Sequence, residues 1–245
     1  MITVKACIDK KAFNFNTGNT HLFMKKFLIS LLFFPAAVIA QDSPKSYMSV
    51  STEMIFSFAE IDNNGNSEGN NMRWSPVFNP QWMLNRDLGE KFGLFTGLAV
   101  RNVGFIYENP NDTLNNTKTK FRTYNVGIPV GIKIGNINKV LLFGGYEVEF
   151  PISYKQKTFI NEDKEDKDVI WFSERVESVQ HSVLLGFQFR HGATIKFKYY
   201  FSEFFNRDHT ELINGFETKP YDIGVNIFYF SLSWNVFTNV KDMLN

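Results

Sequence analysis

From residue 47 onward, hydrophobic and polar residues alternate along most of the chain with a period of two. This period is typical of β-strands with one apolar face, whereas an amphipathic helix repeats about every 3.6 residues. Helical periodicity is not seen beyond residue 47. The alternation predicts eight strands, at residues 47–59, 75–85, 91–107, 122–135, 139–154, 176–190, 193–204 and 221–237.

Two of these strands depart from simple alternation. In RTYNVGIPVGIKIG, residues 122–135, the apolar residues alternate with a set that includes two glycines, Pro129 and Lys133. Proline has no N–H for a β-ladder, so we expect a bulge or an interrupted ladder at Pro129. In the last strand, Ile223, Val225 and Ile227 have the opposite phase to the apolar residues after them. This change of phase predicts a bulge or a protruding strand end.

The connections between the predicted strands alternate between short and long. Residues 86–90, 135–138 and 191–192 are short turns, whereas the long connections are polar and lie at residues 61–73, 108–120, 158–175 and 206–220. Short periplasmic turns and long outer loops are typical of transmembrane β-barrels. The strands also reach the roughly 9–11 residues that a tilted strand needs to span a bilayer. The fold prediction is an all-β, eight-stranded antiparallel up-and-down transmembrane barrel.

The residue types on the two faces predict which face points inward. The interior of an eight-stranded barrel is just wide enough for side chains to fill it. The bulky aromatic and aliphatic set would overfill that space, so we assign it to lipid and the small or charged set to the lumen. The predicted lumenal charge network comprises Glu53, Arg101, Lys133, Glu147, Glu149, Arg190, Lys196 and Lys198. Charges of both signs predict a plugged interior, and a narrow path for ions or solutes is the alternative.

The beginning of the chain has the pattern of an export signal. Lys25 and Lys26 are followed by an apolar run and by small residues that end at Ala40. This order is typical of a secretory signal peptide. The sequence therefore predicts an upstream extension at residues 1–23 with Met24 as the true first residue, a signal peptide at 24–40, and an exported barrel domain at 41–245.

Composition excludes several classes of function for the exported part. The single cysteine, Cys7, precedes the signal peptide, so disulfides and cysteine-based zinc or nucleophile chemistry are not expected. Residues 41–245 contain 21 basic and 24 acidic residues, a formal charge of −3, without the concentrated basic face of a nucleic-acid-binding protein. The acidic run at 162–168 lacks the ordered ligand spacing of a calcium loop, and we expect a solvated loop there. No cofactor or metal site is predicted.

Two candidate sites lie toward the long loops. His181 and Ser182, with a nearby glutamate, are the residue types of an ester hydrolase, which makes a lipid-modifying enzyme the alternative function. Neighbouring residues of a strand point to opposite faces, so His181 and Ser182 are not expected to touch, and we expect no enzymatic activity. Trp171 and Phe172 are apolar residues in a charged connection, which makes them candidates for contact with a partner.

Two motifs resemble a known family. VGIPVGIK at residues 126–133 resembles the apolar-x-Ile-Pro-apolar-x-apolar-Lys motif of PorT-like outer-membrane β-barrel proteins of Bacteroidetes-type bacteria, and GLFTGLAVR at 93–101 resembles the strand before it. The resemblance covers roughly residues 46–237. It implies an outer-membrane protein of Gram-negative type with lipid and other envelope proteins as partners, and some members of the family serve protein secretion.

A weaker resemblance lies in the last strand. Asp222, Gly224, Ile227 and Tyr229 are similar to the signal that the outer-membrane assembly machinery reads. Together these observations predict an integral outer-membrane barrel with a plugged polar lumen. Its expected role is structural or accessory, with outer loops that contact a partner.

Overall fold

The computed structural model describes residues 46–63, 65–68, 71–76, 78–108, 117–135, 139–161, 163–213 and 216–239. The chain divides into two compact units, Met1–Ser43 and Pro44–Asn245, and the described residues all belong to the second. The predicted extension at 1–23 and signal peptide at 24–40 lie outside the described residues. Within them, the regular structure is β apart from one 3-10 turn at Arg190–Gly192.

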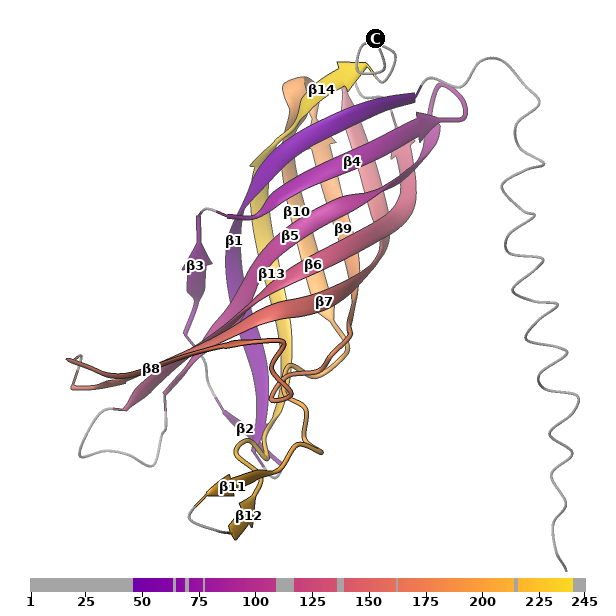
Figure 1. The fold of residues 1–245 in the computed structure, drawn as a ribbon. Coiled ribbons are helices and arrows are strands. Elements are labelled where there is room, and N and C mark those ends of the chain that lie inside the picture. Colours follow the sequence, from indigo (N-terminus) through magenta and orange to yellow (C-terminus); the bar gives the residue numbers. More distant parts are fainter. Residues whose placement is uncertain are drawn as a thin grey trace, which may run out of the picture. The chain divides into compact units, whose positions relative to one another are not determined.

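Eight strands of the second unit form a closed antiparallel ring (Figure 1). In ring order they are β1 (Ser46–Asn63), β4 (Pro80–Asp87), β5 (Phe92–Glu108), β6 (Lys118–Gly135), β7 (Val140–Ile160), β9 (Gln180–Phe189), β10 (Ala193–Tyr200) and β13 (Gly224–Trp234). The ring closes where β13 pairs with β1, with Glu53 opposite Ser233. The predicted eight-stranded up-and-down barrel is confirmed. Closure leaves neither of these strands with an open edge.

Shorter strands extend the ring at both ends. β2 (Asn66–Glu68) and β3 (Arg73–Ser75) pair with β1, and β14 (Val236–Asn239) follows β13 and pairs with the start of β1. β11 (Glu211–Ile213) and β12 (Phe216–Thr218) form a separate hairpin. Figure 1 shows this hairpin at the end of the barrel opposite to β14.

The connection at residues 158–175 is not the predicted loop. β7 continues to Ile160 and pairs with β8 (Asp163–Trp171), so the acidic run lies largely in a strand. The backbone groups of the run are satisfied by this ladder, while its charged side chains remain exposed. Together β7 and β8 form a hairpin that projects past the rest of the wall (Figure 1).

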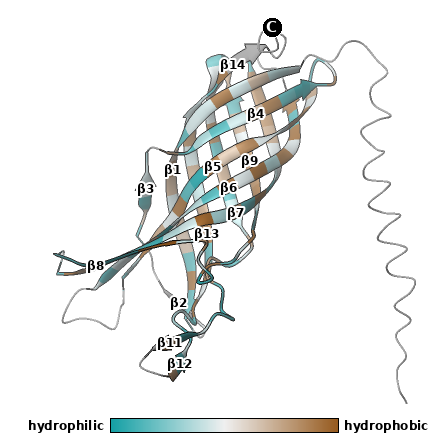
Figure 2. Ribbon diagram, viewed as in Figure 1, coloured by the Kyte–Doolittle hydropathy of each residue, from teal (hydrophilic) through white to brown (hydrophobic). Residues whose placement is uncertain are grey.

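The outward face of the ring is apolar. Hydropathy alternates along individual strands, as Figure 2 shows for the barrel wall. We call the exposed apolar residues of the wall the apolar belt; its members include Met54, Trp82, Leu94, Leu98, Ile128, Val130, Ile132, Val140, Leu142, Phe150, Val183, Leu185, Phe187, Ile195, Phe197, Phe230, Leu232 and Trp234. The belt surrounds the ring, as in barrels that face lipid.

The ladder is interrupted at Pro129, but only on one side. On the side of β7, Pro129 pairs with Glu147 in an unbroken register. On the side of β5, pairing stops after Thr96 with Val130 and resumes at Ala99 with Gly127, without a change of register. The hydroxyl of Thr96 donates a 2.9 Å hydrogen bond to the carbonyl of Pro129. The structure thus contains the interrupted ladder of the prediction and no bulge at this position.

The last strand has no change of phase, so that prediction is wrong. β13 pairs with β1 in continuous register from Gly224 to Ser233. Val225, Ile227 and Tyr229 all point inward and are buried. They look out of phase in the sequence because the interior is apolar at this level, whereas it is polar further along the barrel.

Candidate functional site

The centre of the barrel holds a network of charges that are fully shielded from solvent. Lys198 of β10 is bonded to both inward-facing carboxylates of β7: its Nζ lies 2.6 Å from Glu147 Oε2 and also contacts Glu149 Oε1. Strand β9 lies between β7 and β10, and its Ser182 is small enough for the side chains to meet across it. The Ser182 hydroxyl donates to the backbone carbonyl of Glu147 at 3.1 Å.

Arg101 extends the network to the opposite wall. Its guanidinium lies 3.2 Å from Glu53 Oε2 and 3.3 Å from Glu147 Oε1, so it joins β1 and β7 from β5. Lys196 of β10 lies 2.5 Å from the other oxygen of Glu53. The cations Arg101, Lys196 and Lys198 therefore balance the carboxylates Glu53, Glu147 and Glu149. A neutral set with close contacts avoids the large cost of an unpaired buried charge.

Polar side chains complete the coordination of the network. The hydroxyl of Tyr200 and the amide of Asn125 each donate to Glu149 at 2.8 Å. Arg101 donates to the side-chain oxygen of Gln81 at 3.1 Å, and Asn125 also donates to Gln180 at 2.8 Å. These uncharged partners were not predicted from the sequence. Their positions on the inward face of the predicted strands were visible in the sequence. Only the register of the paired strands brings their side chains together.

Gly127 makes room for the network. A Cβ built at this position would collide with the Glu147 carboxylate and lie 3.0 Å from Glu149 Cγ. Gly127 pairs with Glu149 across the β6–β7 ladder. A glycine fits at position 127 because the side chains of Glu147 and Glu149 approach its backbone closely.

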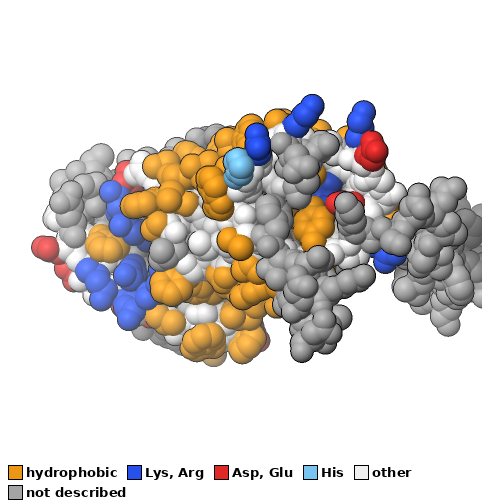
Figure 3. All heavy atoms as spheres, turned by 90° about the horizontal axis from the view of Figure 1, so that it is seen from above, with side chains coloured by type: hydrophobic (Ala, Val, Ile, Leu, Met, Phe, Trp, Pro, Cys, Tyr) orange, Lys and Arg blue, Asp and Glu red, His pale blue; other side chains and the backbone are white. Residues whose placement is uncertain are grey.

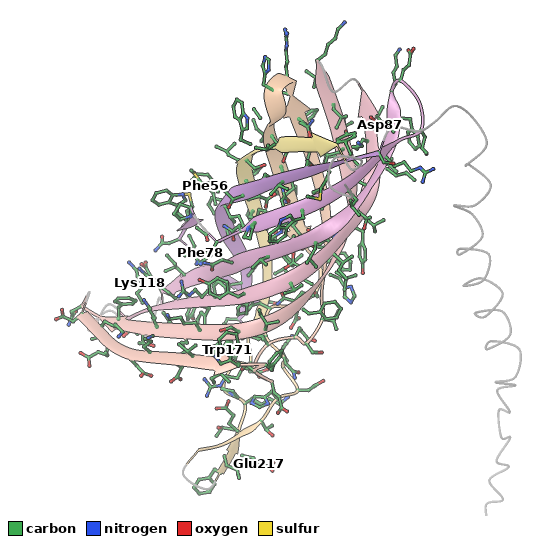
Figure 4. All side chains as sticks on the ribbon, turned by 45° about the horizontal axis from the view of Figure 1, so that its top comes forward. Phe56, Phe78, Asp87, Lys118, Trp171 and Glu217 are labelled. Atoms are coloured by element: carbon green, nitrogen blue, oxygen red, sulfur yellow. The ribbon has the colours of Figure 1, made fainter. Side chains whose placement is uncertain are left out.

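Two members of the predicted lumenal set are not part of the central network. Arg190 is exposed in the turn between β9 and β10, where the strand has already ended. Lys133 is buried but does not contact Glu147 or Glu149. Its Nζ lies 3.0 Å from Asp87 Oδ1 and 2.7 Å from the Tyr47 hydroxyl, at the short-turn end of the barrel, where Figure 4 shows Asp87.

Toward the long loops, the interior changes from polar to aromatic. Phe204 and Phe205, which follow β10, insert among inward residues of the wall. Phe205 stacks on Tyr221 with ring centroids 4.4 Å apart and meets Phe121 edge to face at 5.2 Å, while Phe105 contacts both inserted rings. The predicted polar interior is thus wrong for this part of the barrel. The charged network and the aromatic cluster fill the interior at two successive levels.

A small cavity borders the network on its other side. It has a volume of about 50 Å³, and its lining includes Glu53, Gln81, Asn85, Arg101, Lys133 and Lys196. A cavity needs roughly 10–15 Å³ to hold one water molecule, so this cavity has room for only a few waters.

An ion-pair cluster ties the outer loops to each other. Arg175, which follows β8, binds Glu211 of β11 through two bonds of 2.5 and 3.0 Å. His209 Nε2 lies 3.1 Å from the same carboxylate, and Asp168 lies 3.5 Å from the guanidinium. The hydrogen bond from Arg175 lowers the pKa of Glu211, and the bond to Glu211 raises the pKa of Arg175.

Trp171 and Phe172 are exposed beside a groove. Their side chains are 66% and 76% accessible, and Figure 4 shows Trp171 at the loop end of the molecule. Phe172 has a φ of 50°, an unusual conformation for a bulky residue, and its amide donates to the carbonyl of Ile152 at 3.1 Å. The groove has a volume of about 750 Å³, and its lining includes Phe150, Ile152, Phe172, Glu174, Glu177, Asp208 and His209.

His181 is engaged in an aromatic contact on the outer wall. Its Nδ1 lies 2.5 Å from the Tyr146 hydroxyl, and its ring stacks against Tyr146 and Phe201. Ser182 points inward, as predicted from strand geometry, so the histidine and this serine do not meet. Within the described part of the chain, no carboxylate lies within ion-pair distance of His181.

The described residues contain no helix that is both long and apolar enough to cross a membrane. They also contain no group of three or more His, Cys, Asp or Glu side chains arranged to hold a metal ion.

Comparison with known proteins gives structural similarity at low sequence identity. No protein-family model and no curated sequence matches the chain. The structural neighbours include outer-membrane eight-stranded β-barrel proteins. Ail, the attachment invasion locus protein of Yersinia pestis, solved with the heparin analogue sucrose octasulfate, is 11% identical, with 80% of this chain and 100% of that chain covered at a TM-score of 0.35.

Two further structures have similar values. For Neisserial surface protein A the identity is 10%, the coverage is 80% of this chain and 99% of that chain, and the TM-score is 0.35. For the outer membrane protein OprG of Pseudomonas aeruginosa the identity is 12%, the coverage is 78% and 96%, and the TM-score is 0.33.

Proposed function

We propose that this chain is an integral outer-membrane β-barrel protein with a plugged lumen and a structural or accessory role. The observation that carries the proposal is the distribution of residues across the barrel wall. A continuous apolar belt covers the outside, while the network of Glu53, Arg101, Glu147, Lys196 and Lys198 is buried inside. A water-soluble barrel would expose its charged face and bury its apolar one. The partners of the wall are then membrane lipids and, during insertion, the outer-membrane assembly machinery.

Membrane fractionation tests the proposed location. We expect the protein in the outer-membrane fraction, resistant to extraction with alkaline carbonate and released by detergent. Its mobility on a denaturing gel should change on heating, because a folded barrel resists detergent until it is boiled. Recovery in the soluble fraction without detergent would contradict the proposal.

The packed interior argues for an accessory role over transport. The charged network and the aromatic cluster of Phe204 and Phe205 fill successive levels, and the cavity beside them holds only a few waters. We therefore do not favour the alternative of a narrow solute channel. Planar-bilayer recordings of the purified barrel are expected to show no stable conductance steps.

The outer-loop end supplies the surface for a partner. Trp171 and Phe172 present large apolar side chains beside a groove that also carries Glu174, Glu177 and Asp208. Burial raises the pKa of Glu177, and the nearby carboxylates of Glu203 and Asp208 add to the effect. Aromatic residues are enriched at protein interfaces, and an acidic rim complements a basic partner segment. The proposed partner is an envelope protein that offers both apolar and basic side chains.

Crosslinking and co-purification test this contact. Replacing Trp171 and Phe172 with Ser is expected to remove proteins that co-purify with the wild type. Replacing Leu212 and Phe216, which are equally exposed in the separate β11–β12 hairpin, provides a matched control. An unchanged set of partners in the first variant would contradict the proposed surface.

A more specific role that we propose for the protein is in protein secretion. It is supported by the resemblance of residues 93–101 and 126–133 to PorT-like proteins. Deleting the gene is expected to reduce the amount of secreted protein in the medium without loss of outer-membrane integrity. Unchanged secretion would restrict the protein to a general envelope role.

The proposal includes no catalytic step. The His181 ring packs beside Tyr146 and Phe201 on the outer face of the wall, whereas Ser182 points inward. A strain with His181→Ala is therefore expected to keep the lipid composition of the wild type. A specific change in acyl-chain content would instead favour the lipid-modifying hydrolase.

A further inference from the structure

A group of basic side chains lies on the outer wall just beyond the apolar belt. In the β6–β7 ladder, Arg122 is directly opposite Lys155 and Lys120 is directly opposite Lys157. In the β7–β8 ladder, Lys157 is also opposite Lys167. We call these five residues the basic cluster. Figure 3 shows Lys and Arg side chains gathered toward the end of the molecule that carries β8, beside the hydrophobic surface.

The cluster is electrostatically unbalanced. Directly opposed side chains on a sheet are about 4.5–5.5 Å apart at Cβ, and like charges at that distance destabilise the pair. Among the described residues, no ion pair joins Lys120, Arg122, Lys155 or Lys157 to a carboxylate, and Arg122 Nε is buried without a hydrogen-bond partner.

The nearby carboxylates are directed elsewhere. Asp166 and Asp168 are opposite Thr158 and Gln156, so they lie on the other face of the β7–β8 hairpin, and Asp168 binds Arg175. Glu108 is on the same face but forms a 2.6 Å ion pair with Lys118, at the far edge of the group. Within the described part of the chain, no carboxylate therefore forms an ion pair with the basic cluster.

The wall is hollowed at this position. A hollow of about 280 Å³ is lined by Arg73, Trp74, Ile106, Lys120, Phe121, Arg122, Lys155 and Lys157. Arg73 is nearly buried, and its guanidinium is held by the backbone and side-chain oxygens of Asn102 at 3.1 and 2.6 Å. Burial and then Arg122 lower the pKa of Arg73 to about 10. The hollow therefore combines fixed cations with the apolar surfaces of Trp74 and Ile106.

The position of the hollow relative to the belt identifies its occupant. Arg122 lies on the same face of β6 as Ile128, Val130 and Ile132, separated from them by Val126 and Tyr124. In a membrane-inserted barrel, the step from apolar to basic residues falls where the lipid tails end and the headgroups begin. Guanidinium and ammonium groups bind phosphate strongly, and basic sites at this depth attract anionic lipids.

We propose that the hollow binds the phosphate-bearing headgroup of a membrane lipid. Arg122, Lys155 and Lys157 supply the positive charge, and Trp74 and Ile106 contact the apolar part of the lipid next to its headgroup. This inference rests on the proposed membrane location. It goes beyond that location because it assigns a lipid class to one place on the wall.

Native mass spectrometry of the intact barrel in detergent tests the site. The probes are phosphatidic acid, which has an uncovered phosphate, phosphatidylcholine, in which choline covers it, and soluble glycerol phosphate. We expect the wild type to retain phosphatidic acid in preference to phosphatidylcholine. In the variant with Arg122→Gln, Lys155→Gln and Lys157→Gln, the affinity for phosphatidic acid should fall by about 10- to 100-fold.

A control variant separates local recognition from net charge. Lys91→Gln, Lys139→Gln and Arg190→Gln remove the same charge from exposed positions at the short-turn end and should leave lipid retention unchanged. Heat-modifiable gel mobility identifies any variant that fails to fold, and the pair Lys155→Arg and Lys157→Arg, which keeps the charge, should retain the lipid. Equal loss in the cluster and control variants, no preference in the wild type, or equally tight binding of glycerol phosphate would each overturn the proposal. A barrel that fractionates with the membrane but shows no lipid preference would refute the site and leave the proposed location intact.

Discussion

Lys198 and Glu147 form a fully buried ion pair of 2.6 Å across the centre of the barrel, on strands that are not neighbours in the ring. The pair joins β10 to β7 over β9, and Arg101 continues the connection from Glu147 to the far wall. The network therefore links separate parts of the wall through the interior.

Removing Lys198 should destabilise the barrel strongly. Lys198→Met leaves Glu147 and Glu149 without their common partner, and the loss of one side of a buried pair costs about 3–5 kcal/mol. Urea unfolding in lipid vesicles, followed by tryptophan fluorescence, measures the change in the free energy of unfolding. Adding Glu149→Gln to Lys198→Met restores neutrality and should recover part of the loss. A single variant as stable as the wild type would show that the network does not hold the wall together.

A methyl group at Gly127 should disturb the same network. Gly127→Ala places a Cβ against the Glu147 carboxylate, and overpacking of this kind costs about 1–3 kcal/mol. Gly144→Ala on β7 is the matched control, since a Cβ there would have its nearest neighbours at 3.5 Å. The urea midpoint should fall for the first variant and stay close to that of the wild type for the second. An equal fall in the urea midpoint for both variants would mean that the close approach at Gly127 does not cause the loss of stability.

The hydroxyl of Thr96 should stabilise the interrupted ladder at Pro129. Thr96→Val removes the 2.9 Å hydrogen bond to the Pro129 carbonyl and should cost about 0.5–1.5 kcal/mol. Thr52→Val makes the same change at another exposed position of the wall, where no side-chain hydrogen bond to a described residue is found. The difference between the two variants in urea unfolding isolates the hydrogen bond. A Thr96 variant that matches its control would exclude this role.

The clamp between Arg175 and Glu211 should open in acid. Because the pKa of Glu211 is lowered in the folded protein, its contribution is fully present above the unfolded pKa, about 4.3, and is lost as the pH falls through the lower folded value. Hydrogen exchange of the segment around His209, corrected for the intrinsic effect of pH, should show protection at pH 5 to 7 and its loss below about pH 4. Glu211→Gln should show little protection at any pH. The same pH dependence in both proteins would contradict the clamp.

The wall of the barrel could be predicted from the sequence because alternation is a local property. Ile128, Val130 and Ile132 occupy every second position, and a strand places such residues on one face whatever it pairs with. The strand count, the short turns and the inward set around Glu53, Arg101 and Glu147 follow from the same period. The basic cluster could not be predicted in this way, because its members lie on β6, β7 and β8 and only the register places them opposite each other.

Residue type and spacing show which residues share a face of a strand: the apolar belt outside, the charges around Glu53, Arg101 and Glu147 inside, and the strand breaker at Pro129. The partners that these residues meet depend on the folded barrel. The phase of the alternation placed Arg190 on the same face as Lys196 and Lys198, but strand β9 ends at Phe189. Lys133 pairs with Asp87 and not with a carboxylate of the central network. Phase also could not show that the inward residues Val225 and Ile227 pack under Phe204 and Phe205. The direction in which a side chain points is set by the local period of the backbone. The residue that it contacts depends on strand register and on closure of the ring, because these join residues far apart in the chain.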